Sequence, residues 1–566
     1  MVPLRRPDAT RAFSTLPGSA PPCGNLGAVQ SFDYVIVGAG SAGCVLANRL
    51  TQDGRHRVLL LEAGGSERRL RVQVPIGYGL SFHDPQLNWR LHTEPEAALA
   101  GRSGYWPRGK VLGGSSSINA MVYVRGQPAD YERWATEGNP GWGWDDALRC
   151  FRRMERFAAA PDALRGHDGP LHVSDVSADV HPLCQAWLRA GGELGLPANA
   201  GFNGASAEGL GLYELTVHGG LRMSAARAWL RPAMQRANLT VHTGALVTRI
   251  EFAGRRALAV HYERDGQAQR VQARREIVVC AGAVHSPLVL QASGVGPGSL
   301  LQALGIAVVH DLPAVGQHLQ DHLCIDHLYR ARVPTLNQEL GTWPGRLRAA
   351  LRYLMARRGP LSLSVNQGGG FVRTSAASVR PDLQLYFSPL SYTRAVPGQR
   401  ALMRPDRFPG FLLSAQPCWP TSRGHVHLRS ADLRAPPLIV PNSLATPEDL
   451  EALVLGSLWL RRLATTPALA AIIDAELQPG AQAQSRAQLE DDIRQRASTV
   501  FHPVGTCRMG PDERTAVVDA RLRVHGLAGL RIIDASIFPH ITSGNTNAPT
   551  MMVAERGAEL MAEDAR

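Results

Sequence analysis

The stretch Phe32-Asp-Tyr-Val-Ile-Val-Gly-Ala-Gly-Ser-Ala-Gly43 decides the fold of this chain. Its first half is a short apolar run, which is typical of a buried strand, and a run of glycines follows at once. Residues 44–52 have the composition of a helix, and the run 57–61 predicts a second strand that ends at Glu62. The sequence therefore predicts a strand, a helix and a strand that open a doubly wound α/β domain.

This unit is typical of dinucleotide binding. Glycines let the main chain and a helix N-terminus approach a pyrophosphate, and a carboxylate at the end of the second strand can bind ribose hydroxyls. The unit does not separate FAD from NAD. The residues expected to contact the cofactor here are Gly38, Gly40, Ser41, Ala42, Gly43, Glu62 and Ala63.

Length and composition indicate a folded enzyme of more than one domain. The 566 residues are too many for one compact core, and hydrophobic (44%) and charged (19%) fractions are ordinary. The formal charge of +12 comes from scattered arginines with Lys110 as the single lysine, which indicates compositional bias. We therefore expect no nucleic-acid partner.

The cysteines favour a reducing compartment. The eight cysteines show neither paired nor metal-type spacing, so we expect no metal site. No apolar window is long enough to cross a bilayer. The interpretation is a cytoplasmic enzyme, or one attached peripherally to the inner face of a membrane.

Residues 1–30 are interpreted as a loose extension. They contain Arg5, Arg6 and Arg11, several prolines and no apolar segment long enough for a secretory signal. A transit peptide, a mis-assigned start codon and plain disorder all stay open.

Further along the chain, strand and helix patterns divide it into two interleaved domains. Amphipathic helix is expected over 130–160, strands over 239–247, 250–260 and 275–280, and helices over 447–471 and 486–497. A last buried strand is expected over 530–534. The first domain is assigned to residues 31–155, 221–320 and 500–566. A substrate-binding domain with a mostly antiparallel sheet is assigned to 156–220 and 321–499.

Four long motifs, in order, resemble those of the glucose-methanol-choline (GMC) oxidoreductases. They are the runs 109–119, 282–296, 501–510 and 534–547, and the linking runs Val315-Gly-Gln-His-Leu-Gln-Asp-His322 and Ser422-Arg-Gly424 agree with the same family. The resemblance covers about residues 32–560 and is nearest to bacterial choline-dehydrogenase-like and alcohol dehydrogenase members. It implies an FAD-binding domain and oxidation of an alcohol.

The resemblance also implies which other residues hold FAD. Backbone amides near Gly113 can line the flavin, and Met121–Val124 is expected to form a strand. Some family members tether FAD through a histidine where this chain has Ile118, so we expect non-covalent FAD. The additional cofactor residues are Gly109, Val111, Gly113, Gly114, Ser115, Asn119, Ala120, Met121, Val122, Val247 (expected at a strand end), Ala281, Gly282, Asp534, Ala535, Asn547 and Thr550.

His502 and Asn545 are the candidate catalytic residues. A base must take the hydroxyl proton while hydride leaves carbon for the flavin, and imidazole suits this near neutral pH. His502 lies in the family-like run 501–510. Asn545 lies where the family places a second polar group, and its amide can steady the developing alkoxide.

Substrate and acceptor are less constrained. Choline-specific relatives carry a cation-binding glutamate at the position that corresponds to Gln367 when the chains are matched at Gly369-Gly370-Phe371, so a neutral amide here makes choline the second choice. Phe387, Trp419 and Phe501 are candidates for an apolar pocket wall, which favours a primary aliphatic or aromatic alcohol. The acceptor is a quinone-type compound or oxygen. A flavin lyase, a photodecarboxylase, a non-catalytic flavoprotein and a nicotinamide dehydrogenase remain alternatives.

Overall fold

A strand, a helix and a strand open the fold, as the sequence predicts. The computed structural model describes residues 30–158, 162–394 and 403–565, so the expected extension over 1–30 lies almost wholly outside the described residues. β1 (Ser31–Val37) and β2 (Val58–Leu61) flank α1 (Ser41–Leu50) and pair in parallel. Both strands are packed on two faces, which explains their unbroken apolar runs.

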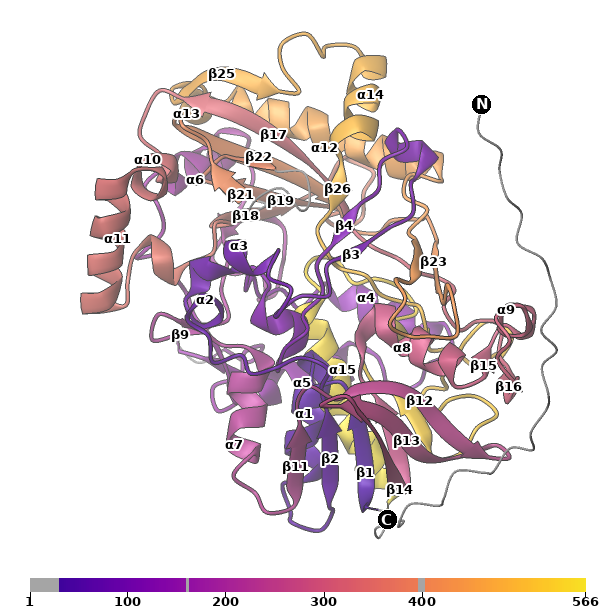
Figure 1. The fold of residues 1–566 in the computed structure, drawn as a ribbon. Helices are drawn as coiled ribbons and strands as arrows, with labels where there is room; N and C mark the ends of the chain where they lie inside the picture. The colour runs from indigo at the N-terminus through magenta and orange to yellow at the C-terminus, as the bar shows by residue number, and fades with distance from the viewer. Residues whose placement is uncertain (1–29, 159–161, 395–402, 566) are drawn as a thin grey trace, which may run out of the picture.

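The two strands belong to a seven-stranded sheet whose members are distant in sequence. β11, β2, β1, β14 and β27 pair in parallel, whereas β12, β13 and β14 form an antiparallel extension. The carboxyl ends of the parallel strands therefore gather at one edge (Figure 1), where α/β sheets bind ligands. The added strands are β11 (Leu239–His242), β12 (Leu246–Ala253), β13 (Arg256–Arg264), β14 (Gln267–Val279) and β27 (Leu530–Ile532).

A second, eight-stranded sheet stands above this edge (Figure 1) and is antiparallel except between β7 and β8. The two sheets confirm the predicted fold class, while the domain boundaries stay a prediction. In spatial order the strands are β25 (Ile473–Gln478), β17 (Leu323–Ala331), β22 (Gly410–Pro417), β19 (Leu383–Ser388), β18 (Gly368–Val372), β8 (Gly209–Leu212) and β7 (Ala198–Asn199), with β26 (Ser498–Thr499) beside β17.

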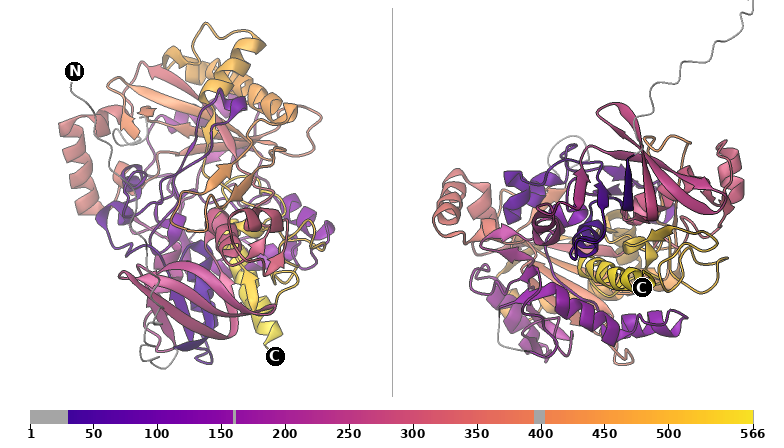
Figure 2. Two further views of the ribbon diagram at one scale, coloured as in Figure 1. Left: turned by 45° about the vertical axis from the view of Figure 1, so that its right-hand side comes forward. Right: turned by 90° about the horizontal axis from the view of Figure 1, so that it is seen from below.

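Helices cover both sheets. α12 packs on β22 and α6 packs on β8, while α1 and α15 lie side by side against one face of the first sheet (Figure 2). The longer helices are α4 (Pro128–Thr136), α5 (Trp144–Met154), α6 (Cys184–Glu193), α8 (Gly282–Ala292), α9 (Gly298–Ala303), α10 (Leu336–Gly341), α11 (Trp343–Ala356), α12 (Pro447–Ala464), α14 (Arg486–Arg496) and α15 (Asn547–Asp564), and the short ones are α2 (Leu70–Gln73), α3 (Tyr78–Ser81), α7 (Arg231–Ala233) and α13 (Pro467–Ala470).

Five expected elements differ from the structure. The strand expected over 250–260 is the end of β12 and the start of β13, which form a hairpin that turns at Gly254 (φ 56°). The helix expected over 130–160 is two helices, because Gly138 and Gly141 adopt left-handed backbone with φ of 94° and 82°. Gly244 (φ 65°) likewise divides the strand expected over 239–247, so Val247 lies near the start of β12. Residues 121–124 form no strand and make a single bridge, Val122 to Leu215. The helix expected over 447–471 ends at residue 464 and restarts as α13.

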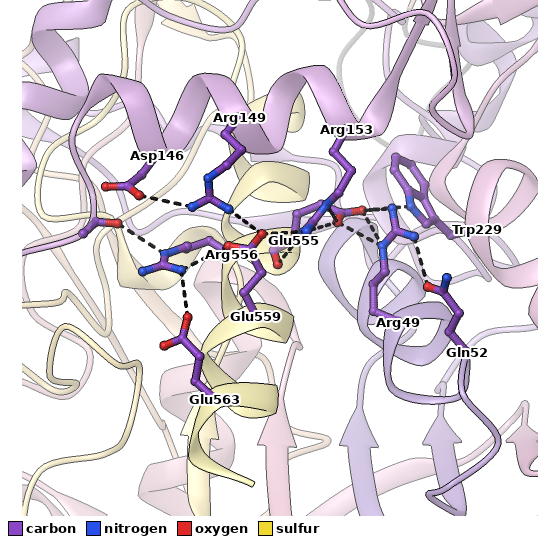
Figure 3. Close-up of polar contacts among 11 residues, drawn as sticks. Arg49, Gln52, Asp146, Arg149, Arg153, Trp229, Glu555, Arg556, Glu559 and Glu563 are labelled. Atoms are coloured by element: carbon purple, nitrogen blue, oxygen red, sulfur yellow. Dashed lines mark hydrogen bonds and ion pairs between the residues drawn. The ribbon is translucent and has the colours of Figure 1, made fainter. Parts of the chain in front are cut away.

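The C-terminal helix α15 is fastened to α1 and α5 by a buried carboxylate (Figure 3). Glu555, whose side chain is 0% exposed, pairs with Arg49 at 2.8 Å and Arg153 at 2.7 Å, and it accepts a hydrogen bond from Trp229 Nε1 at 3.2 Å. Two charge-assisted pairs and an indole donor satisfy this buried charge. α15 thereby holds a fixed position against the first sheet. Among the described residues, no helix has the length and apolar character needed to cross a membrane.

Candidate active site

A cavity of about 590 Å³ lies where the two sheets face each other. Its walls come from the carboxyl ends of β1, β2 and β14 and from β17, β19 and β22. The predicted cofactor residues that line it are Gly38, Gly40, Ser41, Ala42, Glu62, Ala63, Gly109, Gly114, Ser115, Asn119, Ala120, Met121, Val122, Val247, Ala281, Gly282, Asp534, Ala535, Asn547 and Thr550.

Gly43, Gly113 and Val111 do not line the cavity, because they pack the chain behind it. A Cβ on Gly43 would lie 1.9 Å from the carbonyl oxygen of Gly38, so this glycine lets α1 approach β1. Gly113, with φ of 87°, donates its N–H to Ala39 O at 2.7 Å. The three residues shape the wall without facing a ligand.

The β1 to α1 turn presents backbone amides to the cavity. The N-cap Gly40 has no side-chain hydrogen bond, so the first turn of α1 stays available to an anion. The buried carboxylate of Glu62 accepts from the N–H groups of Ala39 at 2.9 Å and Gly64 at 2.8 Å. Burial raises the pKa of Glu62 to about 7 despite these donors.

The loop over 109–122 also lines the cavity, next to the turn between β1 and α1. A Cβ on Gly114 would lie 2.7 Å from the Cα of Gly40, so the two glycine segments touch through their backbones. Asn119 accepts from Met121 N at 3.0 Å and from Arg222 at 2.7 Å through its oxygen. Its amide nitrogen is therefore the group left for a ligand.

Residues 534–550, near the end of the described chain, also line the cavity. Asp534 accepts from Gly282 N at 2.8 Å and Ser286 Oγ at 2.6 Å, which joins the end of β27 to the start of α8, and burial raises its pKa. Ser41 Oγ donates to Asn547 at 2.8 Å. Residues from the two ends of the chain are thus in direct contact at the site.

His502 lies on the cavity wall and forms a pair with a second histidine, His322. Their Nδ1 atoms are 3.1 Å apart, and Nε2 of His322 is 2.9 Å from the carbonyl oxygen of Cys418. Burial lowers the pKa of His322 to about 4. Burial first, and then electrostatic repulsion by His322 and Arg108, lowers the pKa of His502 well below its ordinary value. Both rings are therefore neutral near pH 7.

The hydrogen bonds assign the protons of this pair. A carbonyl only accepts, so Nε2 of His322 carries a proton and its Nδ1 is bare. His502 must then donate from Nδ1, which leaves its Nε2 bare. Asn545 Nδ2, a donor, lies 3.1 Å from that Nε2, in agreement with this tautomer.

Asn545 is itself held in place. Its oxygen accepts from Gln384 Nε2 at 3.4 Å, and Gln384 also donates to Tyr213 at 2.9 Å. The structure thus brings the two predicted catalytic residues together, with the amide of Asn545 directed at the unprotonated nitrogen of His502.

Two residues that sequence reasoning missed support His502 from behind. Asp321 accepts the backbone N–H of His502 at 2.7 Å, and Arg108 donates to the carbonyl of Phe501 at 2.6 Å. Phe501 has a φ of 72°, a conformation that is rare outside glycine and that collects at functional sites. Burial raises the pKa of Asp321 to about 7. Asp321 and His322 both lie in the family-like run 315–322, so that run could have identified them as candidate site residues.

Of the predicted pocket residues, Phe501 lines the cavity and three do not. Gln367 lies directly before β18, and its side-chain oxygen accepts from His181 N at 2.7 Å, so it does not face the cavity as a cation subsite would. Phe387 is stacked on Trp187 in the core of the second sheet. Trp419 donates to Asp130 at 2.8 Å. The apolar wall is instead Tyr78, Phe82, Val365, Tyr386, Leu412 and Phe501.

Known proteins are similar to this chain over most of its length. Two GMC oxidoreductase family models match residues 32–324 and 420–554. The chain is 42% identical to an alcohol dehydrogenase (acceptor) of Pseudomonas putida, covering 94% of this chain and 95% of that protein. It is 40% identical to the mitochondrial choline dehydrogenase of Mus musculus over 98% and 94%.

A solved structure agrees with the fold. Pyridoxine 4-oxidase from Mesorbium loti matches with a TM-score of 0.84 and 33% identity, covering 94% of this chain and 99% of that one. With the glycine cradle, the histidine pair and matches of this extent, the chain belongs to the GMC oxidoreductase family, whose enzymes oxidise a CH–OH group with FAD.

Proposed function

We propose that this enzyme oxidises a primary alcohol to an aldehyde with non-covalent FAD, with His502 as the base. The electrons pass to a quinone-type acceptor or to oxygen. The observation that carries the proposal is the hydrogen-bonded pair of neutral histidines, which leaves Nε2 of His502 unprotonated on the cavity wall beside Asn545.

The residues of the cavity fit FAD. The contact between Gly40 and Gly114 leaves a cradle that side chains would fill, and the open first turn of α1 suits a pyrophosphate. Glu62 stands at the end of β2 with lone pairs left for hydroxyl groups. Ile118 is buried among apolar neighbours and offers no nucleophile, which supports non-covalent binding.

His502 and Asn545 divide the work on the substrate. Bound FAD supplies the hydride acceptor. Nε2 of His502 takes the hydroxyl proton, and the amide of Asn545, oriented by Gln384, donates to the oxygen as negative charge develops on it. As His502 becomes charged, its Nδ1–H to His322 becomes a stronger, charge-assisted hydrogen bond.

The wall chemistry favours an apolar alcohol. Phe82 and Phe501 have ring centroids 5.6 Å apart, and Leu412 and Val365 continue the apolar surface. Choline is the second candidate, because the carboxylate residues Asp326 and Glu96 also line the cavity and could attract an ammonium group.

The test is anaerobic reduction of the purified yellow enzyme by a panel of primary alcohols that includes benzyl alcohol, a long aliphatic alcohol and choline. Bleaching by one class identifies the substrate, and reoxidation in air or only by a quinone identifies the acceptor. His502→Ala should lower turnover by about 10² or more. Bleaching by none of the alcohols would contradict the proposal and favour a lyase or a photodecarboxylase.

A further inference from the structure

Helix α11 carries an exposed apolar stripe. Trp343, Leu354 and Met355 expose 74%, 69% and 80% of their surfaces, and Leu347 and Leu351 expose 45% and 47%. These residues recur every three or four positions, so they lie along one side of the helix. A contiguous apolar surface of this kind on a folded protein marks an interaction site.

The opposite side of α11 is anchored, so the stripe faces outward in a fixed orientation. Ala349 and Tyr353 are buried, and the hydroxyl of Tyr353 donates to Gly220 O at 2.9 Å. Figure 1 and the left view of Figure 2 show α11 at the outer edge of the molecule.

Arginines border the stripe on both sides. Residues 343–358 contain five arginines and no acidic residue. At 100° per residue, Arg348 and Arg352 fall on one border of the stripe and Arg346 falls on the other. Arg352 and Arg358 share Asp179, whereas Arg346 contacts only the carbonyls of Leu340 and Gly341 among the described residues. Positively charged side chains therefore lie along both borders of the apolar stripe.

We propose that this face of α11 binds the surface of a membrane that contains anionic lipid. The apolar side chains would enter the headgroup region, as in other interfacial amphipathic helices, and the arginines would meet lipid phosphates. Trp343, at the N-terminal end of the stripe, is the residue type enriched at this depth. A second copy of the chain is a poorer partner, because a two-fold interface would bring like-charged arginine borders together.

The helix is also close to the cavity. α11 packs on the short helix η5 (Pro360–Ser362), which packs on η1 (Pro75–Gly77) directly before the cavity residue Tyr78. Membrane binding on this face would place that wall of the cavity near the lipid. The binding itself does not depend on the proposed reaction.

The test is co-sedimentation of the full-length holoenzyme with phosphatidylcholine vesicles, with and without phosphatidylglycerol. We expect binding to the anionic vesicles, and a reduction of about tenfold or more in the Leu347→Gln, Leu351→Gln double variant, because both side chains lose their transfer out of water. The matched control is Met234→Gln, Leu458→Gln, whose side chains are equally exposed (45% and 47%) elsewhere, and it should bind like the wild type.

A second variant separates charge from apolar contact. Arg346→Gln, Arg348→Gln should weaken binding only when phosphatidylglycerol is present and should reduce its sensitivity to salt. Flavin content and melting temperature establish that each variant is folded. Absent binding, equal binding to neutral vesicles, or wild-type binding by the leucine variant would each overturn the proposal. A dimer in light scattering that the leucine variant dissociates, without a change in vesicle binding, would assign the face to a second copy and overturn it too.

Discussion

Replacing His322 should slow catalysis while leaving the substrate-facing residues in place. In His322→Leu the Nδ1–H of His502 loses its acceptor, and the Cys418 carbonyl loses its donor. The loss at the Cys418 carbonyl affects the stability of the folded enzyme and is the same before and during the reaction. The energetic cost of the loss at His502 increases during the reaction, because His502 gains a positive charge when it takes the proton.

The size of the effect follows from this difference. A hydrogen bond to a charged group contributes about 1.5–3 kcal/mol. At about 1.4 kcal/mol for each factor of ten, kcat/KM should fall roughly 10- to 150-fold, with most of the loss in kcat. Stopped-flow reduction of the flavin under anaerobic conditions measures the step directly.

Two variants control for structure. Gln in place of His322 can donate to the carbonyl and accept from His502, so His322→Gln should recover much of the rate. His327→Gln alters a buried histidine on β17, the strand that begins directly after His322. Its ring contacts Ser457 Oγ at 2.6 Å and does not line the cavity, so this variant should leave kcat unchanged. If folded His322→Leu retains kcat within about threefold, the histidine pair does not set the tautomer of the base.

Three further outcomes are expected. Because protonation of His502 removes the base and its pKa is lowered well below 6.5, kcat/KM should stay level as pH falls to 6.5 and decline only at lower pH; an apparent pKa at or above 6.5 in that profile would contradict the assignment. Glu555→Ala should lower the free energy of unfolding by about 2–4 kcal/mol, since Arg49 loses its carboxylate partner and the buried Trp229 loses its acceptor, while Arg153 keeps Glu559. Glu563→Ala at the exposed end of α15 should change the melting temperature little. Acid precipitation should release all FAD into the supernatant, and yellow colour retained in the pellet would show a covalent bond.

Local signals were sufficient for the cofactor side of the site. The run 32–43 and Glu62 form one contiguous unit, so the strand, the turn and the helix follow from residues close in sequence. The same holds for the loop over 109–122, whose backbone lines the cavity over consecutive positions. Gly138 and Gly141 broke an expected helix because their left-handed backbone outweighs the amphipathic pattern.

The residues of the substrate pocket could not be predicted from local sequence signals, because which side chains face the cavity depends on strand register. On β19, Tyr386 and Ser388 line the cavity, and Phe387 between them points into the opposite core. A shift of one position reverses every such assignment. The position of His322 beside His502 depends on a contact between segments far apart in the sequence. Leu323 pairs with Thr499, and this pairing places His322 beside residues 500–502.

The contact between Ser41 and Asn547 has a consequence for biosynthesis. β1 pairs with β14 and β14 pairs with β27, so the parallel sheet is complete only after residues 530–532 have been made, and α1 gains its partner α15 only after residues 547–564 have been made. A nascent chain therefore emerges with its nucleotide cradle half built and an unsatisfied strand edge, the state in which large proteins aggregate or need chaperones. Loss of residues 530–564 would therefore remove β27 and α15 and destabilise the first sheet, which begins with β1 at residue 31.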